Sequence, residues 1–144
     1  MVGAQLRATS APGKEATGRE AGRVLVVSDD RHLRQMLAAI GAEEGYVVET
    51  TEWREEALGQ CLSTEQHLVM VDWVSPPLVM PLISQVRRQH GSARIVVMVP
   101  SWSELEPSAR LAADHVLHKP LRVNQVRRVL AEALAPERHP NLAT

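Results

Sequence analysis

The run LVMVDW, at residues 68–73, ends an apolar stretch with a carboxylate, Asp72. A buried charge without a partner is costly, so Asp72 is either a loop residue just past a strand or a group held there for chemistry. Two other apolar runs also end in polar residues, one in the acidic pair Asp29-Asp30 and one in Lys119. If the three strands are parallel, these side chains lie at the carboxyl edge of one sheet, where reactive groups gather.

The chemistry that suits this set is phosphoryl transfer to an aspartate. Carboxylates at close range repel one another unless a cation lies among them, and an all-oxygen cluster suits Mg²⁺. A lysine opposite could pair first with Asp72 and then with a phosphoryl oxygen. Metal and lysine would offset charge on the transferred group while the carboxylate becomes the covalent acceptor.

Apolar runs suited to strands alternate with amphipathic helical segments, and these elements must position the polar groups. The runs are short and rich in β-branched residues, whereas the segments between them repeat apolar residues at helical spacing. The predicted strands cover 23–27, 46–50, 67–71, 94–99 and 115–117, and the apolar helical faces are Leu33-Met36-Leu37-Ile40, Trp53-Ala57-Leu58-Cys61, Val79-Leu82-Ile83-Val86 and Val126-Val129-Leu130-Ala133.

Cap and breaker residues predict where the helices begin and end. Thr51 can cap the second helix, and the third is expected to begin at Pro81, because proline is tolerated in a first turn. Ser103 and Glu106 have capping-box spacing before a short fourth helix. The remaining ends are predicted near Gly45, Ala113 and Pro136.

Five strand–helix units in succession predict an α/β fold. Regular alternation implies a parallel sheet with helices on both faces and right-handed crossovers. The runs at 23–27 and 94–99 do not alternate between apolar and polar residues, which is typical of central strands buried on both sides.

Composition narrows the function classes. The 144 residues are 44% hydrophobic and 23% charged, with a net charge of −1 that gives no electrostatic case for nucleic acid. The lone Cys61 excludes an internal disulfide and suits a reducing compartment. No apolar run is long enough to span a membrane and no export signal is present, so we expect a cytoplasmic protein. Residues 1–22 are predicted to be a flexible tail, 23–135 the domain and 136–144 a short tail.

The motifs VLVVSDD, LVMVD and AADHVLHKP resemble the receiver domain of two-component response regulators over residues 23–135. That family has a flavodoxin-like three-layer fold with five helices and strand order 2-1-3-4-5. It is phosphorylated on an aspartate by a histidine kinase or phosphotransfer protein with Mg²⁺, and it signals through the face of its fourth helix, fifth strand and fifth helix.

The resemblance implies a role for each matching residue. Asp72 would be the phosphoacceptor, Lys119 the lysine beside it, and Lys119-Pro120 a cis peptide. Asp29 and the carbonyl of Val74 would bind the metal directly, together with Asp72. Asp30 is also expected to belong to the metal site.

Four positions depart from the family pattern. Ser28 replaces the first of the expected acids, and Pro100 stands where a hydroxyl residue is expected, with Ser101 one place later as a possible substitute. Val116 replaces the aromatic switch residue, and Met80 replaces a glycine usually found after the phosphoacceptor.

Two functions therefore remain open. The first is a stand-alone receiver, not an enzyme, that accepts phosphate on Asp72 and signals through a protein partner. The second is a pseudo-receiver that works as an interaction module without phosphorylation. The retained residues favour the first function, namely Asp29, Asp30, Asp72 and Lys119. The departures at Ser28, Pro100 and Val116 favour the second. His115 and His118 point to opposite faces of a strand, so they are not expected to bind a metal.

Overall fold

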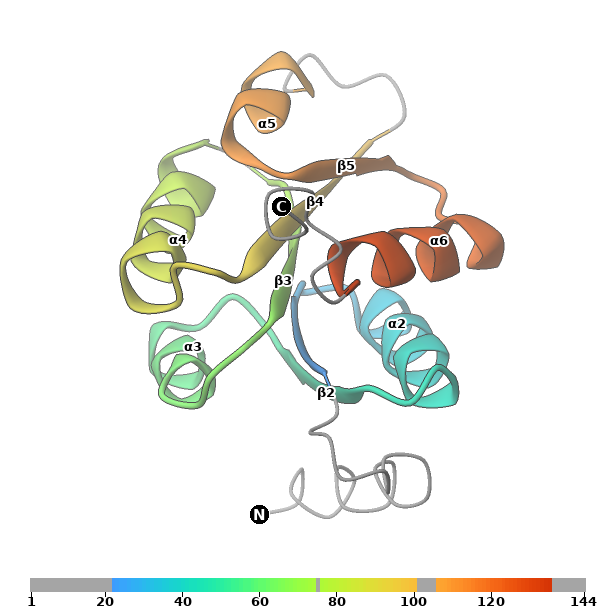
Figure 1. Ribbon diagram of the computed structural model, residues 1–144. Coiled ribbons are helices and arrows are strands. Elements are labelled where there is room, and N and C mark those ends of the chain that lie inside the picture. The colour runs from blue at the N-terminus through green and yellow to red at the C-terminus, as the bar shows by residue number, and fades with distance from the viewer. Residues whose placement is uncertain (1–21, 75, 101–105, 136–144) are drawn as a thin grey trace, which may run out of the picture.

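The computed structural model describes residues 22–74, 76–100 and 106–135 (Figure 1). The described residues form five strands and five helices that alternate along the chain. The strands are β1 (Arg23–Val27), β2 (Val47–Thr51), β3 (Leu68–Asp72), β4 (Arg94–Val99) and β5 (His115–His118), and the helices are α2 (Arg31–Glu43), α3 (Glu55–Leu62), α4 (Pro76–Gln89), α5 (Glu106–Ala112) and α6 (Val123–Ala133).

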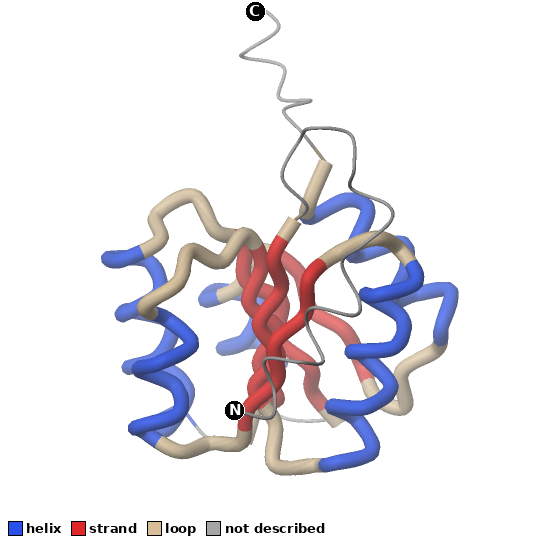
Figure 2. Tube along the Cα trace, turned by 90° about the horizontal axis from the view of Figure 1, so that it is seen from below, coloured by secondary structure: helices blue, strands red, loops and turns tan. Residues whose placement is uncertain are grey.

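The strands form one parallel sheet in the order β2-β1-β3-β4-β5. Helices lie on both sides of it, so the domain has three layers (Figure 2). The predicted α/β, flavodoxin-like fold with strand order 2-1-3-4-5 is thus confirmed. Because all strands run the same way, their carboxyl ends share one edge of the sheet.

The core has two parts, one on each face of the sheet. On one face, α2 and α6 pack against alternate residues of the central strands, such as Val26 and Met70. On the other, α3, α4 and α5 pack against the intervening residues, such as Val27 and Val71. Every residue of β3 is buried, as expected for a strand covered on both sides.

Several predicted helical faces match the structure. The four apolar residues predicted for the last helix are all buried in α6. In α2, Leu33, Leu37 and Ile40 are buried and Met36 packs partly against the core. Gly45 follows this helix with a φ of 93°, a conformation that favours glycine.

The predicted start of α3 is wrong. Thr51 is the last residue of β2, where its carbonyl accepts a hydrogen bond from the Ser28 N–H at 3.0 Å. The helix begins four residues later, at Glu55, and Trp53 lies before it. The sheet ladder therefore engages Thr51 and keeps it from capping the helix.

The predicted start of α4 is also wrong, because the helix begins at Pro76 and Pro81 lies inside it. An interior proline removes one backbone hydrogen bond and costs about 3 kcal/mol. Burial of the predicted face, Val79-Leu82-Ile83-Val86, stabilises the helix by roughly 1.5–3 kcal/mol per side chain. Packing of this face outweighs the proline.

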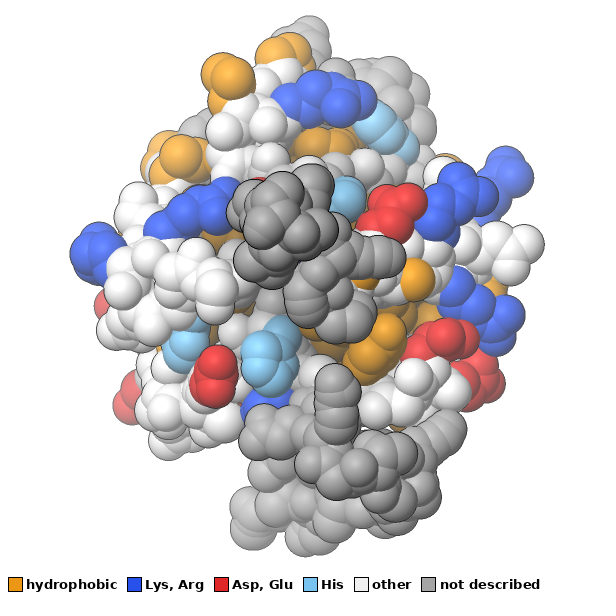
Figure 3. Space-filling view, in the orientation of Figure 1, with side chains coloured by type: hydrophobic (Ala, Val, Ile, Leu, Met, Phe, Trp, Pro, Cys, Tyr) orange, Lys and Arg blue, Asp and Glu red, His pale blue; other side chains and the backbone are white. Residues whose placement is uncertain are grey.

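The surface seen in Figure 3 mixes charges of both signs. On the α2–α6 side, Arg127 pairs with Glu43 at 3.1 Å and with Glu44 at 3.2 Å. Within the described residues, no helix is long and apolar enough to cross a membrane.

Candidate functional site

Asp72 is the last residue of β3, and it is only 7% exposed. Its Cα pairs with Met98 in the neighbouring strand β4. The carboxylate is therefore part of the central strand, at the carboxyl edge of the sheet. Of the two interpretations of LVMVDW, the structure favours a group held in place over a loop residue.

Lys119 supplies the positive charge for this buried carboxylate. Its Nζ lies 2.5 Å from Asp72 Oδ1, and the Lys119 side chain is 32% exposed. The backbone holds this residue in register, because the Lys119 N–H donates to the Val99 carbonyl at 2.7 Å. The Lys119-Pro120 peptide is cis, as the resemblance implied.

Ser28 hydrogen-bonds the other carboxylate oxygen of Asp72. Its side chain is fully buried, and its Oγ donates to Asp72 Oδ2 at 2.8 Å. The same Oγ accepts the Asp30 N–H at 3.0 Å. From the sequence, Ser28 was expected only to replace an acid, whereas in the structure it is a direct partner of Asp72. Its position between a buried strand and the acidic pair was the signal that could have revealed this role.

Asp29 and Asp30 do not hydrogen-bond Asp72 or Lys119, and each accepts a hydrogen bond from a backbone N–H group. Asp29 Oδ1 accepts the Trp53 N–H at 2.8 Å, which anchors the loop after β2. Asp30 Oδ1 accepts the Leu33 N–H at 3.2 Å and caps α2. The three predicted carboxylates are therefore not gathered as one metal cluster. Among the described residues, no three His, Cys, Asp or Glu side chains are grouped to hold a metal ion.

A smaller oxygen set still matches what Mg²⁺ requires. Asp72 Oδ1 is buried, and the Lys119 ammonium is the group beside it. Asp29 follows the adjacent strand β1 and uses only Oδ1 in its bond to Trp53. Mg²⁺ keeps several waters and uses one or two carboxylates, a number that Asp29 and Asp72 would supply.

Arg34 is a residue of this edge that the sequence analysis did not single out. Its Nη1 donates to the Ser28 carbonyl at 2.7 Å, and its Nη2 lies 3.8 Å from Glu52. The guanidinium therefore fixes the backbone of the residue that hydrogen-bonds Asp72.

Two of the positions that depart from the family pattern can be placed in the fold. Pro100 is exposed after β4, and Val116 is partly buried on β5, against the core formed with α3, α4 and α5. Ser101 and Trp102 lie outside the described residues. Trp73 is 2% exposed in the core, and its indole N–H has no hydrogen-bond partner.

Comparison with known proteins gives structural matches only. No family model matches the chain, and no curated protein matches it. Among solved structures, NtrX from Brucella abortus in complex with ATP is 26% identical, with a TM-score of 0.69 over 80% of this chain and 27% of that chain. This chain thus spans about a quarter of that NtrX chain.

Two smaller proteins match over nearly their whole length. The receiver domain of the same NtrX is 23% identical, with a TM-score of 0.65 over 77% of this chain and 97% of that chain. A CheY-like receiver domain protein from Methanospirillum hungatei JF-1 is 22% identical, with a TM-score of 0.67 over 78% of this chain and 93% of that chain. With its strand order and with Asp72 and Lys119 at the carboxyl edge, this chain has the receiver-domain fold of response regulators.

Proposed function

We propose that this protein is a receiver that accepts a phosphoryl group on Asp72 and signals through protein–protein contact. The observation that carries the proposal is the buried Asp72 carboxylate at the end of β3, with Lys119 on one oxygen and Ser28 on the other. A purely structural aspartate at this edge needs only a backbone partner, as Asp29 has. Side-chain partners from two distant segments support a role for Asp72 beyond shaping the backbone.

The phosphoryl donor is a phosphohistidine of a histidine kinase or phosphotransfer protein. A lone pair of the Asp72 carboxylate attacks phosphorus and forms the new P–O bond, while the electrons of the P–N bond return to the imidazole, which takes up a proton. Lys119 stabilises the negative charge on the phosphoryl oxygens, and Ser28 keeps the carboxylate in position. In this proposal the chain is a phosphoacceptor and not an enzyme.

Mg²⁺ is the cofactor that this chemistry favours. Asp29, Asp72 and the Val74 carbonyl would hold it, and when bound it offsets charge on the transferred group. Asp30 is left out of this set because it caps α2. Calorimetric titration of Mg²⁺ should give weak binding to the wild type and to Asp30→Ser, and none to Asp72→Asn.

Phosphorylation itself is tested by intact-mass measurement after incubation with acetyl phosphate and Mg²⁺. The wild type should gain the mass of one phosphoryl group, and Asp72→Asn should gain none. Asp30→Ser, which changes an acid at the same edge, is the matched control and should be modified like the wild type. No mass gain in the wild type, or equal gain in Asp72→Asn, would contradict the proposal.

The downstream partner is expected to bind the face of α5, β5 and α6. A second candidate function, a pseudo-receiver that works without phosphorylation, is favoured by two observations. Ser28 stands where the family pattern has an acid, and Pro100 lacks the hydroxyl expected after β4. If the protein is a pseudo-receiver, Asp72→Asn leaves binding to the partner unchanged. If it is a phosphorylation-dependent receiver, the same variant no longer changes its partner binding in response to acetyl phosphate.

A further inference from the structure

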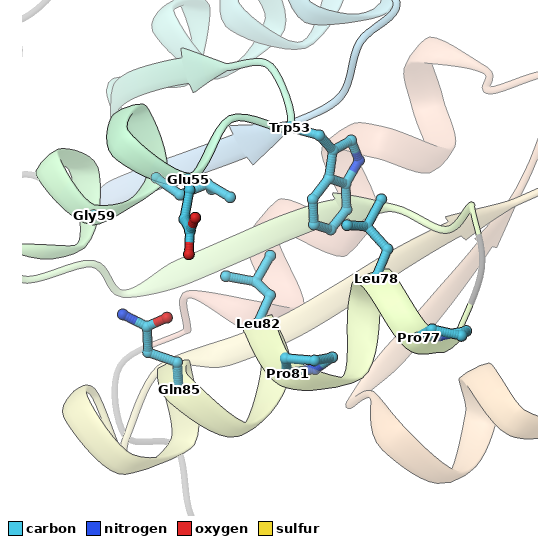
Figure 4. A pocket seen from close by; sticks show the side chains of 9 residues that line it. Trp53, Glu55, Gly59, Pro77, Leu78, Pro81, Leu82 and Gln85 are labelled. Atoms are coloured by element: carbon cyan, nitrogen blue, oxygen red, sulfur yellow. The ribbon is translucent and has the colours of Figure 1, made fainter.

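A groove between α3 and α4 has no part in the proposed phosphoryl chemistry. It has a volume of about 580 Å³, within the roughly 300–1,000 Å³ of ligand sites. Trp53 and the first turns of the two helices line one end, and Gln85 lies further along α4 (Figure 4). Its lining residues all lie within the described part of the chain, and they include neither Asp72 nor its partners Ser28 and Lys119.

The groove is mainly apolar. Leu78, Pro81 and Leu82 lie at helical spacing on the side of α4 that faces α3. Leu78 is 45% exposed, although it lies next to the buried Leu82. On the α3 side, a Cβ built on Gly59 meets no atom within 4 Å, so the space above this helix is open.

The polar groups of the groove favour a positive charge. Glu55 is its one charged lining residue, and its carboxylate points into the groove (Figure 4). The nearby Arg34 and Arg54 pair instead with Glu52. The first turn of α4 has little to offer an anion, because Pro76 and Pro77 have no backbone N–H to donate.

We propose that the α3–α4 groove binds a small organic cation with an aromatic or branched apolar body. The apolar body packs against Trp53, Leu78 and Leu82. The ammonium pairs with the Glu55 carboxylate. The Gln85 side-chain oxygen is a second acceptor for the ammonium.

The chemical shift of the Trp53 backbone amide can be used to detect binding at this site. Its N–H donates to Asp29 Oδ1 at 2.8 Å, so a ligand that shifts the indole also perturbs this amide. Binding can be followed without Mg²⁺ or phosphate, so its failure is distinct from failure of the proposed function.

The test is an amide chemical-shift titration of the full chain with tryptamine. Tryptophol and indole-3-propionate present the same aromatic body with a neutral and a negative group, and are titrated in parallel. We expect saturable shifts at Trp53, Gly59 and Leu78, with tryptamine about fivefold tighter than tryptophol and indole-3-propionate weakest. Equal affinity for all three, or shifts centred elsewhere, would overturn the proposal.

Two matched variants separate this site from general charge effects. Glu55→Gln should remove the preference for tryptamine over tryptophol, whereas Glu56→Gln should keep it, because Glu56 is in the same helical turn but does not line the groove. Gly59→Leu should fill the groove and weaken all three ligands at least tenfold, while helix propensity favours its folding. An equal loss in both glutamine variants, or unchanged binding in Gly59→Leu, would contradict the proposed site.

Discussion

Three acidic residues at the same edge of the sheet fall into two kinds, which differ in burial and in hydrogen-bond partners. Asp72 is buried and faces the side chains of Ser28 and Lys119, which come from distant parts of the chain. Asp29 and Asp30 are exposed, and each accepts a backbone N–H. An aspartate at the carboxyl end of a strand is therefore not identified as reactive by its residue type and position alone. Burial and side-chain partners distinguish the candidate nucleophile from acids that shape the backbone.

The largest effect is expected from removing the cation of the buried pair. Lys119→Met keeps the apolar stem but leaves the Asp72 charge without its partner, so the free energy of unfolding should fall by about 1–3 kcal/mol. This range is below that of fully buried pairs because Lys119 is 32% exposed. Urea denaturation at neutral pH measures it.

A double-mutant cycle with Asp72→Asn provides the control for this prediction. If the loss comes from an unpaired charge, Asp72→Asn should recover a large part of it in the Lys119→Met background. Additive losses in the double variant would mean that Lys119 stabilises the fold by packing alone.

Ser28→Ala should have the next largest effect. It leaves Asp72 Oδ2 and the Asp30 N–H without their shared partner, and a lost buried hydrogen bond costs about 1–2 kcal/mol. Thermal unfolding measures the change, with Ser63→Ala as a control, since Ser63 is exposed and makes one local hydrogen bond. A loss of thermal stability no greater than that of the control would mean that the Ser28 hydrogen bonds do not stabilise the fold.

Asp30→Ala should lower the free energy of unfolding by about 1 kcal/mol, because it removes the N-cap of α2. Asp30→Ser, which can also cap a helix, should be nearly neutral in stability and in Mg²⁺ binding. If Asp30→Ser kept its stability but lost Mg²⁺ binding, Asp30 would be a metal ligand and the contrast with Asp72 would be wrong.

The sequence predicted the parts of this site that topology determines. Asp72 ends β3 and Lys119 follows β5. Alternation of strands and helices predicts a parallel sheet whose carboxyl ends share one edge, and the resemblance to receiver domains implied the strand order, so their meeting could be inferred before any coordinates. The partners of Asp29 and Asp30 could not, because they depend on where α2 begins and on how the loop at Trp53 turns. The same local uncertainty displaced the predicted starts of α3 and α4 by several residues.

The smallest effect is expected on the face of α5, β5 and α6 when a phosphoryl mimic binds at Asp72. A ligand shifts a conformational equilibrium only by its differential affinity for the two states, so a switch needs contacts that change between them. Pro100, after β4, has neither a hydroxyl nor an N–H to bond the new group. Val116 is partly buried and too small to change this surface much between rotamers.

Amide chemical shifts recorded with and without beryllofluoride in the presence of Mg²⁺ measure this response. We expect changes near Ser28, Asp72 and Lys119, and little change along α6. Asp72→Asn, which cannot be modified, sets the background. Large shifts across β5 and α6 in the wild type alone would show that an ordinary switch operates. Ser101, outside the described residues, would then be the candidate hydroxyl, and Ser101→Ala should abolish those shifts while leaving the shifts at Asp72 in place.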